Sequence, residues 1–297
     1  MTAKAARTYV LLSLLAALLT MGLKLAAFGV TGSVGLLSDA LESGVNLISA
    51  LVAFWALSLA AKPPDAEHPF GHSKAEYFSS GLESALILVA ALTIAWAAWG
   101  RLFEPQPLQT PVGGITLALL ATAINGIVAW ILLRAGRRLH SIALRADAHH
   151  LLTDVWTSLG VVTAVAVVAL TGWTVLDPLI ALAVAANIVW IAVGLMRETL
   201  SGLLDQSIDR SQIEQITALF APYEEQNIRF HLLRTRLAGT QCFISFHVLV
   251  PGHWTVQDGH DLCERLETAI AALIPGSHVT THLEPLEDPR SWQHPPL

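Results

Sequence analysis

Charged side chains are scarce in this sequence, and their scarcity indicates its class. Only 13% of the 297 residues are Asp, Glu, Lys or Arg, whereas 54% are hydrophobic. The mean hydropathy is +0.56. A soluble domain carries roughly a quarter charged residues. The composition therefore predicts a membrane protein that is in contact with the lipid bilayer.

Three further deficits exclude other classes of protein. Lys and Arg total 17 against 23 Asp and Glu, and the formal net charge of -6 argues against nucleic acid as a partner. Two cysteines, Cys242 and Cys263, form neither a disulfide framework nor a CxxC motif, so we expect buried, reduced thiols. The HExxH pattern of zinc peptidases and the GxxxxGK(S/T) phosphate-binding loop are both missing, so neither an intramembrane zinc hydrolase nor a nucleotide cofactor is predicted.

Long apolar runs, in contrast, are abundant. Six runs reach the roughly 20 residues needed to cross a bilayer core, near 8–30, 36–60, 76–100, 112–134, 141–170 and 177–199. After Asp205 charged residues become frequent, and no further run of this length occurs. The sequence therefore predicts an all-α, six-helix transmembrane domain over 1–204 and a soluble domain over 205–297.

Basic residues near the ends of the runs indicate the orientation. They cluster before the first run, between the second and third, and between the fourth and fifth, as Lys4, Arg7, Lys62, Lys74, Arg134, Arg137, Arg138 and Arg145. The connections on the opposite side contain only Arg101. We therefore expect both termini, and the soluble domain, in the cytoplasm.

The soluble domain has the pattern of a small α+β fold. "SQIEQITALFAP" and "VQDGHDLCERLETAIAALIPG" have helical periodicity, and "IRFHLLRTRL" and "CFISFHVLV" alternate like strands around the turn "AGTQ". "SHVTTHLEP" is a last strand. The order α-β-β-α-β predicts an open, ferredoxin-like sandwich.

Two of the apolar runs contain polar residues at the same spacing, three and then four residues apart. These are Asp39, Glu42 and Asn46 in the second run, and Asp147, His150 and Asp154 in the fifth. On a helix such residues share one face, and an ionised carboxylate at the membrane centre costs at least about 2.5–3.5 kcal/mol. A single Asp or Asn often only joins two helices by a hydrogen bond, and that alternative stays open for Asp39, Asp147 and Asn125.

The two polar faces complement each other as a metal site. Facing one another, the helices offer Glu42, Asn46, His150 and Asp154 to a common centre. Carboxylates, an imidazole and an amide oxygen suit a borderline divalent transition metal. His149 is expected to face elsewhere.

The motifs carry a resemblance that covers essentially the whole chain. "KLAAFGVTGSVGLLSDA", "HPFGHSKAE", "LRADAHHLLTDVWTS" and the later "LRTR" with its scattered histidines are similar to those of the cation diffusion facilitator, or cation efflux, family of divalent metal/proton antiporters. The resemblance implies six membrane helices, a cytoplasmic metallochaperone-like domain, a homodimer and a secondary transporter rather than an enzyme. It also implies a bacterial inner (cytoplasmic) membrane.

The resemblance also assigns residues. His150 and Asp154 match the fifth-helix ligands of the transport site, whereas Glu42 and Asn46 stand where the family usually has Asp or His followed by Asp. A loop metal site would use residues of "PPDAEHPFGHSKAEY", and a site between two cytoplasmic domains would use strand and helix histidines. These two sets are Asp65, His68 and His72, and His231, His247, His260, His282 and Glu284. Lys74 is expected to pair with Asp205.

The function that follows is efflux of a divalent metal by alternating access, in exchange for protons. A histidine titrates near pH ~6.5, and a metal needs deprotonated ligands, so proton and metal compete for His150. Zinc is the expected metal, and iron, manganese, cobalt and cadmium are the alternatives. The alternative function, supported by Asn46, is a transport-inactive relative that senses metal or serves as a heterodimer partner.

Overall fold

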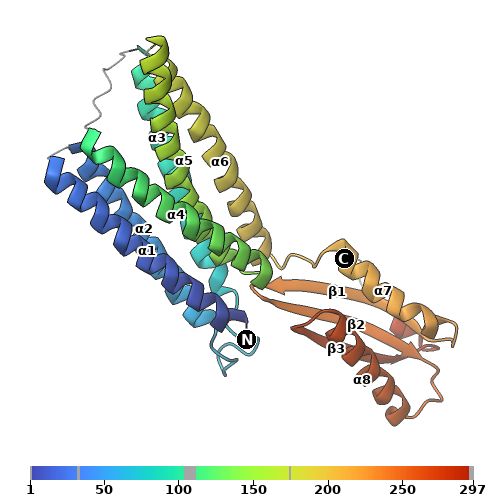
Figure 1. Ribbon diagram of the computed structural model, residues 1–297. Coiled ribbons are helices and arrows are strands. Elements are labelled where there is room, and N and C mark those ends of the chain that lie inside the picture. The colour runs from blue at the N-terminus through green and yellow to red at the C-terminus, as the bar shows by residue number, and fades with distance from the viewer. Residues whose placement is uncertain (1, 32–33, 104–111, 174, 294–297) are drawn as a thin grey trace. The chain divides into compact units, whose positions relative to one another are not determined.

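The computed structural model describes the chain except residues 1, 32–33, 104–111, 174 and 294–297. Within the described helices, the side chains of some residues, Asp39 and Glu42 among them, also lie outside the described part. The chain forms two compact units, Met1–Ser201 and Gly202–Leu297. Figure 1 labels the helices and strands of both, and each unit is described by itself.

In its described part the first unit consists of six long helices. They are α1 (Thr2–Thr31), α2 (Val34–Ala60), α3 (Ala75–Phe103), α4 (Val112–Leu139), α5 (Ile142–Thr171) and α6 (Leu176–Leu203). Each predicted apolar run lies on one of these helices. The shortest, α2, has 27 residues, which at about 1.5 Å per residue exceeds the thickness of a bilayer core of about 30 Å.

Four described stretches are long and apolar enough to cross a membrane. They are Ala6–Ala26 in α1, Ala75–Phe103, Leu119–Leu139 in α4 and Pro178–Leu203 in α6. In α2 the described apolar stretch, Asn46–Ala60, is shorter. The expected count of six crossings therefore remains a prediction for α2 and α5, whose first halves carry the polar residues.

Small apolar side chains hold the helices together in two groups. One core joins α1, α2, α4 and α5 through residues such as Ala6, Ala53, Ala129 and Ala148. A second core joins α3 and α6 around Ile87 and Ile188. Small side chains let helix backbones approach closely in a membrane, where packing replaces the hydrophobic effect as the driving force. Because α5 contacts α1, α2, α3 and α4, polar groups on its surface can meet those of four neighbouring helices.

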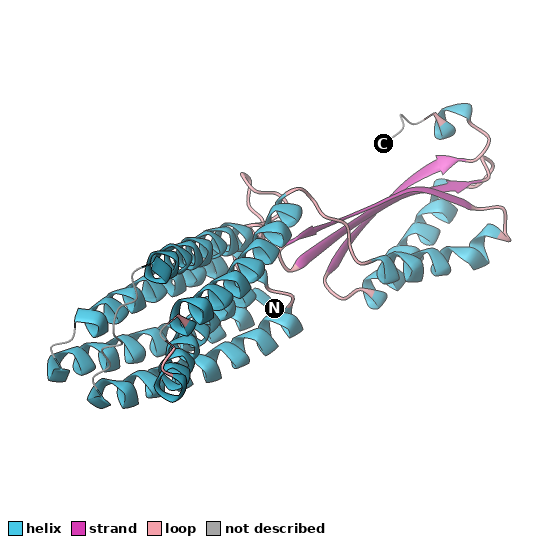
Figure 2. Ribbon diagram, turned by 90° about the horizontal axis from the view of Figure 1, so that it is seen from above, coloured by secondary structure: helices cyan, strands magenta, loops and turns pink. Residues whose placement is uncertain are grey.

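The second unit contains two helices, a three-stranded sheet and a final short helix in its described part. The elements are α7 (Arg210–Glu224), β1 (Arg229–Ala238), β2 (Gln241–Val250), α8 (Val256–Leu273), β3 (Ser277–Pro285) and the 3-10 helix η1 (Pro289–Trp292). The sheet order is β1-β2-β3, with β1 antiparallel and β3 parallel to β2. The predicted order α-β-β-α-β is confirmed, whereas the ferredoxin-like relationship stays a prediction. Figure 2 shows the strands lying side by side.

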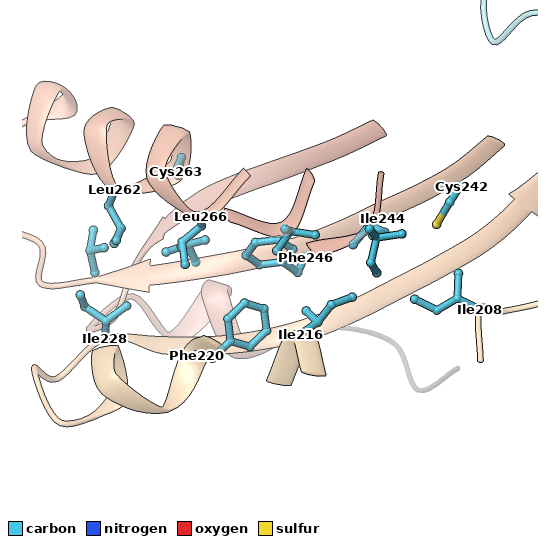
Figure 3. Close-up of a cluster of buried hydrophobic side chains, with 14 residues drawn as sticks. Ile208, Ile216, Phe220, Ile228, Cys242, Ile244, Phe246, Leu262, Cys263 and Leu266 are labelled. Atoms are coloured by element: carbon cyan, nitrogen blue, oxygen red, sulfur yellow. The ribbon is translucent and has the colours of Figure 1, made fainter. Parts of the chain in front are cut away.

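Both helices of this unit cover the same face of the sheet. Alternate residues of β2, from Cys242 to Val250, are buried against Ile216 and Phe220 of α7 and Leu262 and Leu266 of α8, as Figure 3 shows for most of them. Successive strand residues point to opposite faces. His247 and its neighbours in register therefore lie on the other face of the sheet, away from this core.

The two cysteines lie in this core as predicted. Both are buried and unpaired with each other. Burial raises the pKa of the Cys242 thiol to about 11 and also raises that of Cys263. The thiols therefore stay protonated at neutral pH and act as small hydrophobic side chains.

Candidate functional site

A polar group lies buried between α2 and α5, and we call Asn46, His150 and Asp154 the buried group. The Nδ2 amide of Asn46 donates a short hydrogen bond to Asp154 Oδ2, and Asn46 Oδ1 lies 2.6 Å from His150 Nε2. The three residues are 4–7% exposed. The structure therefore brings together three of the four residues that the sequence assigns to one site.

The contacts of Asn46 determine which ring nitrogen of His150 carries a proton. An amide oxygen can only accept, so His150 must donate from Nε2. With Asp154 ionised, the reverse orientation of the amide would set its oxygen against a carboxylate oxygen, where neither is a donor. Asn46 thus links an imidazole donor to a carboxylate acceptor, and His150 Nδ1 is left without a hydrogen-bond partner among the described residues.

A fourth polar residue, Asn125 of α4, contacts this group. Its Nδ2 donates to Asp154 Oδ2 at 3.2 Å, it is 1% exposed, and its Oδ1 has no hydrogen-bond partner among the described residues. The sequence offered only a lone Asn in an apolar run, and a residue of that kind commonly bonds two helices. Asn125 does so here, and it also places an amide oxygen close to the buried group.

The other polar residues on these faces of α2 and α5 are Asp39, Glu42 and Asp147. Asp39 and Glu42 lie on α2, but their side chains fall outside the described part, so the place of Glu42 in the group stays a prediction. Asp147 is 1% exposed and accepts a hydrogen bond of 3.0 Å from Ser13 of α1. That contact is the helix-joining role left open by the sequence.

Further buried carboxyls lie on the polar face of α3, and the sequence interpretation did not single them out. Glu83 and Glu76 are fully buried. Glu83 accepts a hydrogen bond of 2.9 Å from Ser79, and Glu76 accepts one of 2.5 Å from Ser141. Their spacing of seven residues within a run that also contains Ser79, Ser80 and Ser84 could have revealed this face.

The loop between α2 and α3 forms a second group, the loop group of Asp65, His68 and His72. Asp65 Oδ1 lies 3.2 Å from His68 Nδ1, and Asp65 Oδ2 lies 3.4 Å from His72 Nε2. The His68 backbone N–H donates to Asp65 at 2.7 Å. That bond, together with the two imidazoles, lowers the pKa of Asp65. One ligand atom from each of the three residues lies within 4.8 Å of the others, close enough for the three to hold one ion, and the metal site itself stays a prediction.

A third group lies on the open face of the sheet in the second unit, the strand group of His231, His247, His282 and Glu284. His231 pairs with His247 across β1 and β2, and His247 pairs with His282 across β2 and β3. The three imidazoles therefore form one row across the sheet. Glu284, two residues after His282, shares their face.

Glu284 is the centre of the strand group. His231 Nε2 and His247 Nδ1 each lie 3.1 Å from Glu284 Oε2, and His282 Nε2 lies 3.5 Å from Oε1. Partial burial would raise the pKa of Glu284, but the hydrogen bonds from His247 and His231 outweigh it and lower the pKa. His231, His247 and Glu284 lie close enough to hold one metal ion.

Two contacts expected from the sequence, that of His260 with the strand group and that of Lys74 with Asp205, are not among the described contacts inside either unit. His260 is exposed on α8, the helix that covers the opposite face of the sheet, so one chain does not bring it to the strand group. Asp205 accepts a hydrogen bond of 3.3 Å from Arg236. Its expected pairing with Lys74 would join the two units, so it stays a prediction.

Comparisons with known proteins match both units. Residues 10–204 match the cation efflux transmembrane domain, and residues 208–286 match the cytoplasmic domain of cation efflux proteins. The buried group and the loop group lie within the first match. The strand group lies within the second, whereas η1 lies beyond its end.

Whole-length relatives support the same assignment. The uncharacterized transporter sll1263 of Synechocystis sp. is 69% identical over 295 residues, which cover 99% of this chain and 95% of that protein. The cation-efflux pump FieF of Yersinia pestis is 31% identical over 263 residues, 89% of this chain and 87% of FieF. A solved structure of the transporter CzrB in a zinc form is 35% identical, covers 27% of this chain and 92% of that chain, and has a TM-score of 0.26.

Proposed function

Since this chain belongs to the cation efflux family, the cation diffusion facilitators, we propose that it exports zinc from the cytoplasm in exchange for protons. Membership in this family makes it an integral membrane protein and a transporter of divalent metal ions rather than an enzyme. The preference for zinc, the coupling to protons and the secondary active mechanism are the proposal.

The observation that carries the proposal is the buried group between α2 and α5. Asn46 and Asp154 are 108 residues apart in sequence yet hydrogen-bonded, and His150 contacts the same amide. Polar side chains buried in a membrane protein are costly and serve transport pathways. One imidazole nitrogen, one carboxylate and one amide oxygen, with the Glu42 carboxylate one turn before Asn46, supply the mixed ligand set that zinc accepts.

The hydrogen bond between His150 and Asn46 supports the proposed proton exchange. Its Nε2–H donates to Asn46, and Nε2 is the ring nitrogen that points into the group. A metal that binds this nitrogen must displace the proton, because a metal ligand has to be deprotonated. Release of the metal on the far side allows the proton to return. The two ions thus occupy the site alternately, and an inward proton gradient favours metal export.

Asn46 sets the site apart from one with a carboxylate at that position. An amide keeps one oxygen donor but carries no charge and does not titrate in this range. The proposed ligands therefore carry two negative charges, those of Glu42 and Asp154. Histidine favours zinc over manganese, which prefers an all-oxygen site. Iron, cobalt and cadmium fit the same ligand types and are the alternative cargoes.

The membrane arrangement we propose has six crossing helices and both termini in the cytoplasm. The basic residues that predict it include Arg137 and Arg138, in the last turn of α4, and Lys62 and Lys74, which flank the loop group. The membrane would be the inner membrane of a bacterium. In this arrangement the loop group and the strand group both face the cytoplasm, where the metal is taken up.

For the second unit we propose a metal-binding homodimer. The match to a cytoplasmic domain whose family name refers to dimerisation supports an assembly of two copies. In such a dimer the exposed His260 would approach the strand group of the other copy, which would complete a two-metal site. The predicted pair of Lys74 with Asp205 would fix this domain to the membrane helices.

Zinc flux into proteoliposomes tests the proposal. The purified chain is reconstituted, and uptake of zinc is followed with an internal fluorescent indicator, with and without a proton gradient of the driving direction. We expect uptake that the gradient accelerates and that collapses when a protonophore is added. Zinc binding without any flux would support the alternative, a transport-inactive metal sensor or heterodimer partner, for which the neutral Asn46 is the favouring observation.

A further inference from the structure

The chain continues past its last strand and folds back over the strand group. After β3 the backbone N–H of Leu286 donates to the Val250 carbonyl at 2.8 Å, and the chain then turns into η1 (Pro289–Trp292). Figure 2 shows this short helix near the C-terminal end. We call residues 286–292 the C-terminal hook. It begins where the match to the family's cytoplasmic domain ends, at residue 286.

Several hydrogen bonds within the hook, and between the hook and the chain around the sheet, hold it in place. Asp288 caps η1 by accepting from the Arg290 backbone at 2.9 Å, and its carboxylate also pairs with the Arg290 guanidinium. Ser291, which is 4% exposed, donates to the Pro285 carbonyl at 2.8 Å. Glu287 accepts from the Gly252 backbone at 2.8 Å. These contacts define one position for the residue that follows Ser291.

That residue is Trp292, and its indole contacts His231. The ring centroids are 5.6 Å apart and the planes lie at 71°, an edge-to-face contact. The indole N–H donates to the Leu286 carbonyl at 3.0 Å, which fixes the orientation of the ring. His231 is also contacted by His247, with ring centroids 5.1 Å apart. The imidazole thus contacts two rings, and its Nε2 lies 3.1 Å from Glu284 Oε2.

The strand around His231 gives a reason why such support is needed. The pairing of β1 with β2 is irregular between His231 and Arg234, and Leu232 has a φ of 51°, a left-handed conformation that is rare for a residue with a branched side chain. A bulge of this kind redirects the neighbouring side chains. The sheet ladder alone therefore does not fix the His231 ring.

We propose that Trp292 is a positioning residue for the cytoplasmic metal site, which holds the His231 imidazole in the orientation that binds zinc. The inference rests on the proposed role of the strand group as a zinc site. Residues that orient a metal-binding histidine lower the cost of bringing its nitrogen to the metal, and their loss typically reduces metal affinity by about 10–100-fold. Edge-to-face contact with an aromatic ring provides this orientation without any charge.

The experiment measures zinc affinity in the full-length chain, with His150→Ala and Asp65→Ala present to remove the other two groups. Zinc is titrated against a chromophoric competitor. We expect Trp292→Ala to weaken zinc binding about tenfold. Trp292→Phe keeps an aromatic ring but loses the hydrogen bond to Leu286, so its zinc affinity should lie between those of the parent chain and Trp292→Ala. Trp254→Phe is the matched control, since Trp254 packs against the core on the covered face of the sheet, and it should leave the affinity unchanged.

A double-mutant cycle separates positioning from general stabilisation. If Trp292 acts through His231, then Trp292→Ala should have no further effect on zinc affinity in a His231→Ala background. The indole is also observed directly, by fluorine NMR of the chain labelled with 5-fluorotryptophan, in which Trp292→Phe identifies its signal. Zinc should shift that signal in the parent chain and not in the His231→Ala chain.

The outcomes are distinct. Equal zinc affinity in the parent and Trp292→Ala chains, or additive effects in the cycle, would overturn the positioning role while leaving the strand group a zinc site. A parent chain that binds no zinc, with no change on His231→Ala, would overturn the zinc site and the positioning role together. Loss of folding in Trp292→Ala would be recognised by size exclusion, and the Trp292→Phe chain and the NMR signal then decide.

Discussion

Asn46 of α2 and Asp154 of α5 are joined by a hydrogen bond from amide to carboxylate. The oxygen of the same amide accepts from His150, so one neutral residue contacts both ionisable members of the buried group. A metal that binds His150 Nε2 and the Asp154 carboxylate would have to replace both hydrogen bonds. If the buried group is the transport site, as we propose, the identity of residue 46 should influence how strongly it attracts a cation.

The first prediction replaces this amide by a carboxylate. In Asn46→Asp the donor to Asp154 is lost and a second negative charge lies next to it, so the metal-free site is destabilised and a divalent cation is attracted more strongly. We expect zinc binding at pH 8 to tighten by about tenfold, ~1.4 kcal/mol. At pH 6 the gain should shrink, because the added carboxylate and His150 can then bind protons instead.

Calorimetric titration with zinc at pH 6 and pH 8 measures both effects. Asn46→Gln is the matched control, because it keeps a neutral amide, and it should show no gain at either pH. Unchanged affinity and unchanged pH dependence in Asn46→Asp would mean that residue 46 does not face the ion.

The second prediction concerns the two residues of α5. His150→Ala and Asp154→Ala should each reduce zinc flux in proteoliposomes to the background rate, since each removes a ligand that no neighbour replaces. Insertion and folding should persist, because both side chains contribute polar contacts rather than the apolar packing of the helices. His149→Ala is the control. His149 is adjacent on α5 but is not part of the buried group, so flux should be retained.

Much of the architecture could be predicted from sequence because it depends on local pattern. Length and hydropathy predict the six long helices of the described part, and the last predicted strand, "SHVTTHLEP", coincides with β3 at residues 277–285. Helix ends were less predictable. The run expected to end at 134 continues to Leu139, because Arg137 and Arg138 are poor membrane residues but good helix formers.

Residues of the candidate site that share one face of a helix or strand could be predicted from their spacing in the sequence. Contacts that depend on how separate elements pack could not. The three-then-four spacing on α5 pointed to His150 and Asp154, and the alternation of the strands pointed to one face for His282 and Glu284. Nothing in the sequence signals that Asn125 of α4 reaches Asp154, since a lone residue has no period. The contact of Trp292 with His231 depends on a turn after the last strand, whose direction is set by hydrogen bonds between distant groups.

The third prediction is that zinc dimerises the second unit through the row of histidines. The unit has a hydrophobic core of its own, so we expect residues 202–297 to fold when expressed alone. Zinc should convert it from monomer towards dimer, as measured by sedimentation. His247→Ala with His282→Ala should prevent the shift. His278→Ala is the control, since His278 lies four residues before His282 on β3, about 13 Å away. Zinc-driven dimerisation that survives the double variant would contradict the assignment.

The fourth prediction uses the pH dependence of the strand group. The folded pKa of Glu284 is lowered by its histidine partners. Its contribution to stability is therefore present above the pKa of a carboxyl in the unfolded chain, about 4.3, and is lost as the pH falls through the lower folded value. Replacing Glu284 by Gln should lower the melting temperature of the metal-free unit at pH 7 more than at pH 3.

Thermal unfolding of residues 202–297 at the two pH values provides the measurement. Glu264→Gln, an exposed carboxyl on α8, is the control and should change the melting temperature equally little at both. An effect of Glu284→Gln that does not vary with pH would show that its charge is not engaged with the histidines.

The last prediction concerns the loop group. Asp65 accepts from the His68 backbone and contacts both His68 and His72, so it organises the loop as well as supplying a carboxylate. Asp65→Ala should remove one zinc ion from the stoichiometry of the full-length chain, counted by equilibrium dialysis, while the buried and strand groups keep theirs.

Glu67→Ala is the matched control. Glu67 is exposed two residues further on, and only its backbone N–H reaches Asp65, at 3.1 Å. Because the pKa of Asp65 is lowered, its carboxylate stays ionised and available to a metal under mildly acidic conditions. An unchanged zinc count in Asp65→Ala would reduce this group to a turn held by hydrogen bonds.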